Sequence, residues 1–159
     1  MDIFDVAINM EVEGAAFYRE LAKRANSEGL KTIFTMLAED EDRHKEIFEA
    51  MKNETKVPVA APDASERATK IFKQFKKDDF LRGEDELTAY EQALEIELKA
   101  IEYYTQQKES ITDPKKLEII DKIIEEERGH YDILDDIIVM VERPERWVED
   151  AEFGVREEY

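Results

Sequence analysis

Two glutamate–histidine pairs with the same internal spacing are the residues of this sequence best suited to chemistry. Glu41 precedes His44 by three residues. Glu127 precedes His130 by the same spacing, and the 159-residue chain contains no other histidine. Residues three apart in a helix lie on one face, so each pair could bind an ion from one side. Carboxylate and imidazole together favour iron or manganese, whereas calcium and magnesium take oxygen ligands alone, so the pairs indicate a transition-metal site.

Two more glutamates occupy faces of predicted helices that are otherwise apolar. Glu11 and Glu97 each follow an alanine by four residues, and no lysine or arginine lies near them on the same face. An unpaired buried charge is strongly destabilising, and two divalent cations would neutralise the four carboxylates. A polar layer that only specifies the register of the helices is the alternative. We therefore predict that six inward-pointing side chains bind metal: Glu11, Glu41, His44, Glu97, Glu127 and His130.

The candidate ligands repeat at a constant offset of 86 residues, which indicates a duplicated helical hairpin. The offset pairs Glu11 with Glu97, and it pairs each glutamate–histidine motif with the other. Solenoid repeats are shorter and need at least three copies, so this pattern is not a repeat array. Two related hairpins can pack about an approximate two-fold axis, and equivalent residues would then meet near that axis.

Two tyrosines follow the same repeat. Tyr18 and Tyr104 are separated by 86 residues, and each lies two helical turns after a candidate glutamate, on the same face. Two roles remain open for them at this point. They could hydrogen-bond a metal-binding carboxylate, or they could only pack in the core.

Apolar residues recur at spacings of three and four along four long segments, which predicts four helices. The connections are short, long and short, which is typical of a four-helix bundle with one crossover. We therefore predict an all-α, single-domain protein over residues 1–159. Its parts are a helix hairpin at 2–53, a crossover at 54–83 with a short helix at about 65–81, a second hairpin at 84–142, and a C-terminal tail at 143–159.

Local signals indicate where these helices begin and end. The Asn26–Gly29 cluster is expected to form the turn of the first hairpin. Ser65 is the expected N-cap of the short helix. Asp113 and Pro114 are the expected N-cap and first residue of the last long helix.

The composition excludes several functional classes. The chain has 41 acidic and 23 basic residues, a formal net charge of −18, and no cysteine. Such a charge argues against a nucleic-acid partner, and the lack of cysteine excludes disulfides, zinc ribbons and thiol nucleophiles. No apolar stretch approaches the roughly 20 residues of a membrane span, and the N-terminus does not resemble a signal peptide. We therefore expect a cytoplasmic protein without a membrane partner.

From residue 2 to about residue 141, the sequence resembles the rubrerythrin branch of the ferritin-like superfamily, without its rubredoxin domain. One glutamate from each of two helices, plus Glu-x-x-His from two others, is the ligand pattern of ferritin-like di-iron and di-manganese proteins. The resemblance implies a ferritin-like bundle that holds two iron ions, with manganese or mixed metals as other possibilities. It also implies that Glu41 and Glu127 bridge the two ions. The ligands of single ions would be Glu11, His44, Glu97 and His130.

The sequence departs from that family in two ways. The four cysteines of the rubredoxin domain are missing, so the electron donor is expected to be a separate molecule such as a rubredoxin-like protein. The family also places an extra glutamate one turn from the third-helix ligand, where this chain has Leu94 and Ala100. The family's redox-linked movement of the metal is therefore not implied for this chain.

The resemblance implies a di-iron or di-manganese oxidoreductase that reduces hydrogen peroxide or dioxygen, and we expect a homodimer. Three alternatives remain open. The same ligands could serve a ferroxidase or iron-handling protein, which would need a hollow shell or a host cage. An oxygenase would need a substrate pocket beside the metals. A non-enzymatic bundle would use the metal only as a structural staple or as a signal.

Overall fold

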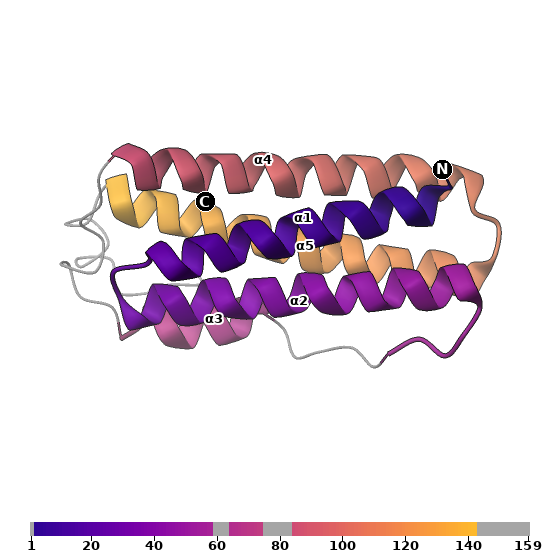
Figure 1. Cartoon of the computed structure of the whole chain (residues 1–159), viewed down its shortest axis with the longest axis horizontal. Coiled ribbons are helices and arrows are strands. Elements are labelled where there is room, and N and C mark those ends of the chain that lie inside the picture. The colour runs from indigo at the N-terminus through magenta and orange to yellow at the C-terminus, as the bar shows by residue number, and fades with distance from the viewer. Residues whose placement is uncertain (1, 59–63, 75–83, 143–159) are drawn as a thin grey trace.

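The computed structural model describes residues 2–58, 64–74 and 84–142. Every regular element in these ranges is helical, which confirms the predicted all-α class. Figure 1 shows the long helices side by side, with a short helix beside them. The long helices are α1 (Ile3–Arg24), α2 (Glu28–Asn53), α4 (Glu84–Gln107) and α5 (Pro114–Glu142). Among the described residues, no helix is both long enough and apolar enough to cross a membrane.

Short connections join the helices of each hairpin. Between α1 and α2, the Ser27 side chain accepts a hydrogen bond from the Leu30 backbone N–H at 3.1 Å and so caps α2. The predicted turn was therefore too long, because Glu28 and Gly29 already belong to the first turn of α2. Between α4 and α5, a 3₁₀ turn (η2, Lys108–Ser110) precedes the predicted Asp113 cap, which accepts from the Lys115 N–H at 3.0 Å.

The short helix of the crossover, α3, spans Ala64–Phe72. The predicted start at about residue 65 agrees to within one residue, although Ser65 lies inside the first turn instead of capping it. Lys73 and Gln74 form a turn where the prediction of about 65–81 had placed helix. Buried residues recur every four positions, at Ala64, Ala68 and Phe72, and the exposed Lys73 that follows forms a turn. Residues 75–81 and the tail at 143–159 lie outside the described residues.

The apolar core is divided into two clusters along the bundle. One contains Phe34 of α2, Tyr90 of α4 and Leu134 of α5, together with the buried face of α3. The other contains Phe48 of α2 and Ile123 of α5. In each long helix, the predicted metal ligands fall in sequence between the residues of these two clusters. The polar residues therefore form a layer across the middle of the bundle.

Candidate metal centre

The structure brings all six predicted site residues together in this polar layer. Helix α1 supplies one glutamate, α4 supplies another, and α2 and α5 each supply a glutamate–histidine pair. The helical period turns each of these positions toward the bundle axis, as the sequence pattern predicts. Each residue is at most 2 % exposed: Glu11, Glu41, His44, Glu97, Glu127 and His130.

The six side chains form two overlapping groups of possible metal ligands. The ligand atoms within each group lie within 4.8 Å of one another. The first group contains Glu11, Glu41, His44 and Glu127, and the second contains Glu41, Glu97, Glu127 and His130. Two carboxylates therefore belong to both groups, while the other four residues belong to one group each.

Distances from the histidine Nδ1 atoms also show that two glutamates lie close to both histidines. His44 Nδ1 lies 3.3 Å from Glu11 Oε1, 3.6 Å from Glu41 Oε1 and 3.5 Å from Glu127 Oε1. His130 Nδ1 lies 3.1 Å from both Glu41 Oε1 and Glu127 Oε1, and 3.4 Å from Glu97 Oε1. The two imidazole rings are 6.0 Å apart and nearly parallel. Glu41 and Glu127 thus contact both imidazoles.

Buried atoms without hydrogen-bond partners indicate what this cluster is suited to bind. Within the described residues, both histidine Nδ1 atoms and at least one oxygen of each of the four glutamates lack a hydrogen bond. Buried polar groups are normally hydrogen-bonded, so a set that converges on one place calls for a binding partner. Nitrogen and oxygen donors in two sets of four suit two transition-metal ions, and the residues fit a di-metal site.

Opposite charges inside the cluster shift the pKa values of its histidines. Burial alone would lower the pKa of His44, but Glu11 and Glu127 raise it well above its usual value. Burial also opposes the charged form of His130, whose pKa is raised by Asp40 and Glu127. Without metal, both imidazoles therefore favour the protonated state and partly neutralise the carboxylates.

The glutamates divide into two classes. Burial and the charge of Glu127 raise the pKa of Glu97 to about 7, and the same two causes raise the pKa of Glu11. Burial followed by repulsion from Glu11 and Glu127 raises the pKa of Glu41 further. Burial also disfavours ionised Glu127, but His44 and His130 together lower its pKa well below the usual value. Metal ions would favour the ionised form of all four carboxylates.

Both tyrosines hydrogen-bond candidate ligands, which decides between the two roles left open by the sequence. The Tyr18 hydroxyl donates to Glu97, and the Tyr104 hydroxyl donates to Glu11. Each tyrosine therefore supports the glutamate of the other hairpin, not the glutamate two turns before it in its own helix. The two hydrogen bonds connect α1 and α4 on both sides of the layer.

Sequence reasoning missed two acidic residues that contact the outer side of the histidines. Asp40 Oδ2 lies 3.0 Å from His130 Nε2, and Glu126 Oε1 lies 3.1 Å from His44 Nε2. A histidine ligand commonly donates its second N–H to a carboxylate, which sets the tautomer and the orientation of the ring. The repeat could have revealed this pair, because Asp40 and Glu126 are also separated by 86 residues.

Comparison with known proteins agrees with the fold and with the site. The rubrerythrin family model matches residues 2–138, which include the six candidate ligands and both tyrosines. No curated protein and no solved structure matches the chain. The all-helical bundle and the buried carboxylate–histidine layer are consistent with a ferritin-like fold and compatible with a di-metal site. The chain belongs to the rubrerythrin family.

Proposed function

We propose that this chain is a di-iron oxidoreductase that reduces hydrogen peroxide or dioxygen with electrons from a separate donor. The observation that carries the proposal is the pair of four-residue donor groups that share two carboxylates. Manganese ions or a mixed pair could use the same nitrogen and oxygen donors.

The proposed ligand assignment follows the distances around the two histidines. Glu11 and His44 would bind one ion, and Glu97 and His130 would bind the other. Glu41 and Glu127, which contact both imidazoles, would be ligands shared by the two ions. When bound, the iron pair supplies the two-electron redox chemistry, one electron from each ion.

The surrounding residues keep the proposed centre ordered and shielded from water. Tyr18 and Tyr104 each hold one oxygen of a terminal glutamate, and the other oxygen of that glutamate is buried without a hydrogen bond. Asp40 and Glu126 orient the two imidazoles from outside. The apolar clusters on both sides bury every candidate ligand, which keeps bulk water away from the reacting groups.

The sequence and the core bear on the electron donor, on the ligand set and on the assembly of the proposed enzyme. It contains no cysteine, so electrons would come from a separate protein such as a rubredoxin-like donor. Ala100, one turn after Glu97, is buried in the apolar core and offers no additional ligand. A homodimer remains part of the proposal, and native mass would distinguish it from the cage that an iron-storage role requires.

Steady-state turnover is the test of this function. The chain is loaded with Fe²⁺ without oxygen and supplied with peroxide and a chemical reductant. We expect many peroxide molecules to be consumed per chain, with almost none consumed by Glu127→Ala. The exposed Glu125 two residues earlier serves as the matched control, and Glu125→Ala should turn over like the wild type. Oxidation that stops after one equivalent per site would reject the enzyme, and a cage-sized native mass would then favour iron handling.

A further inference from the structure

The two halves of the polar layer differ in how their outer carboxylates are held. On α2, Arg43 hydrogen-bonds Glu126 and lies 3.5 Å from Asp40, and its side chain is largely buried. The 86-residue offset places Gly129 at the equivalent position on α5, directly before His130. The second half of the repeat therefore lacks the arginine that the first half has.

Helix α3 packs where a side chain at position 129 would lie. A Cβ atom added to Gly129 would be 3.0 Å from Ser65 Oγ of α3, which is tighter than an ordinary contact. Figure 1 shows α3 beside α2, at the end of the bundle where α1 turns into α2. The glycine thus lets the crossover helix approach α5 at the turn that carries His130.

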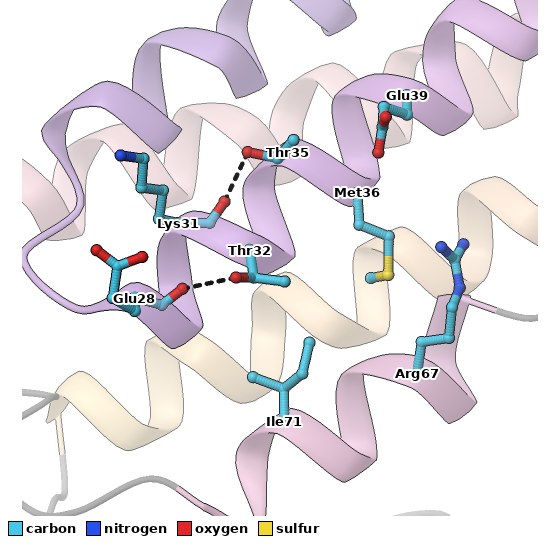
Figure 2. A pocket seen from close by; sticks show the side chains of 8 residues that line it. All are labelled: Glu28, Lys31, Thr32, Thr35, Met36, Glu39, Arg67 and Ile71. Atoms are coloured by element: carbon cyan, nitrogen blue, oxygen red, sulfur yellow. Dashed lines mark hydrogen bonds between the residues drawn. The ribbon is translucent and has the colours of Figure 1, made fainter.

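Arg67 of α3 supplies a guanidinium to this half. Arg67 Nη2 lies 3.3 Å from Asp40 Oδ1, while the other oxygen of Asp40, Oδ2, pairs with His130 Nε2. In Figure 2, Arg67 extends from α3 along a groove that Met36 and Glu39 of α2 also line. The burial of Ala68 and Phe72 in the core holds the helix that carries this arginine.

We propose that Arg67 is a positioning residue for one half of the metal centre, and that it makes the two metal positions unequal. Arg67 holds Asp40, Asp40 orients His130, and His130 serves only one of the two ligand groups. In the other half, Glu126 orients His44, and Glu126 pairs with Arg43, which lies on α2 next to His44. The inference rests on the proposed di-metal site and adds that Arg67 of the crossover helix strengthens the binding of one of the two ions.

The expected effect is a loss of metal affinity confined to one ion. Partners outside the ligand shell commonly contribute roughly 10–100-fold to metal affinity. Arg67 acts through Asp40, one step further from the ion, so we expect about tenfold, at the lower end of that range. A lysine at this position would keep the charge but lose the planar donor geometry, and it should restore part of the affinity.

Titration of the full-length, metal-free chain with Co²⁺, followed by visible absorption, tests the proposal. Wild type should bind two equivalents, and Arg67→Ala should weaken one of them about tenfold while the other is unchanged. Lys70→Ala is the matched control, because Lys70 is an exposed cation on the same helix. Asp40→Asn should weaken the same equivalent as Arg67→Ala. Equal weakening of both equivalents by Arg67→Ala, or equal effects of Arg67→Ala and Lys70→Ala, would overturn the proposal.

Histidine backgrounds identify the affected position. In His44→Ala, which keeps the His130 group, adding Arg67→Ala should weaken the remaining ion. In His130→Ala, adding Arg67→Ala should change nothing further. The reverse pattern would overturn the assignment. Wild-type binding of fewer than one equivalent would instead reject the proposed di-metal site, so the two failures are distinguishable.

A proton signal provides a readout that general destabilisation would not reproduce. In the cobalt-loaded chain, NMR should show two shifted exchangeable imidazole N–H signals, one for each histidine. Arg67→Ala should speed solvent exchange of the His130 Nε2–H alone, and Arg67→Lys should restore part of its protection. Faster exchange of both signals, or of neither, would contradict the positioning role. This readout does not depend on the histidine variants, so it tests the proposal even if those variants bind no metal.

Discussion

The hydroxyl of Tyr18 in α1 donates a hydrogen bond to the carboxylate of Glu97 in α4, so a residue of one duplicated hairpin supports a candidate ligand of the other. Tyr104 and Glu11 form the reciprocal pair. All four side chains are buried, and an unpaired polar group at any of these positions would lose its solvation without compensation. The two bonds therefore join the hairpins at the layer where the metal ions are proposed to bind.

The first prediction concerns Tyr18→Phe. The Tyr18 hydrogen bond favours the ionised form of Glu97, which is the form that binds metal. A hydrogen bond to a charged group contributes about 1.5–3 kcal/mol, so we expect about a tenfold or greater loss of affinity for the ion held by Glu97. Metal titration measures this loss. Tyr103→Phe, which changes a partly exposed neighbour of Tyr104, should have no effect, and equal losses in both variants would contradict the prediction.

The second prediction is that the metal-free protein loses stability as pH rises. The folded-state pKa of Glu97 is raised from 4.5 to about 7, so its contribution is present below about pH 4.5 and is lost as pH approaches 7. The pKa values of His44 and His130 are raised above 6.5, so their contribution is lost as pH rises through those values. Glu127 has a lowered pKa and acts in the opposite direction, in acid only.

Thermal unfolding with a chelator should therefore give a melting temperature that falls between pH 5 and pH 8. Metal binds ionised carboxylates and neutral imidazoles and releases their protons, so added Mn²⁺ should stabilise most at the higher pH. The exposed Glu13 is a suitable control, because Glu13→Gln should leave the pH profile unchanged. A melting temperature that rises over this range without metal would contradict the assigned charge states.

The third prediction concerns Gly14→Ala. Replacing glycine by alanine inside a helix usually stabilises it by about 1 kcal/mol. At position 14, however, the added Cβ would lie 2.7 Å from Glu41 Oε2, so this buried carboxylate must move. We expect weaker binding of both ions, because Glu41 belongs to both ligand groups, while the metal-free protein remains folded.

Metal titration and the melting temperature of the metal-free protein measure the two effects separately. Ala100 occupies the position equivalent to Gly14 in the 86-residue repeat, and it provides the control. Ala100→Gly should lower stability through helix propensity and leave the metal stoichiometry unchanged. Undiminished metal affinity in Gly14→Ala would mean that Glu41 is not held against α1 when metal is bound.

The fourth prediction separates shared ligands from single ones. Glu41→Ala or Glu127→Ala should disturb both ions, whereas His44→Ala or His130→Ala should each weaken one. Bound metal per chain and the near-ultraviolet absorption of the oxidised iron pair measure these losses. Glu13→Ala removes an exposed glutamate two residues from Glu11 and should change neither. The shared role would be wrong if a histidine variant lost both ions and a Glu41 variant lost one.

The sequence alone was sufficient to predict which residues face inward. A helical face depends on the local backbone period, so the spacing around Glu11 and Glu97 predicts their burial without knowledge of neighbouring helices. The same local rules predicted the Asp113 cap. They were less successful for α3, which ends at Phe72, because the exposed Lys73 and Gln74 form a turn where helix was predicted.

Only the tertiary structure decided which residues meet across helices. Tyr18 supports Glu97 and not Glu11, and Asp40 supports His130 of the other hairpin, because the axial offset and rotation of packed helices set these contacts. The approach of Arg67 to Asp40 depends on how α3 packs against α5 at Gly129. The helical period along one chain segment carries no information about such offsets, so the candidate ligands were predictable, whereas the pairing of each ligand with its supporting residue was not.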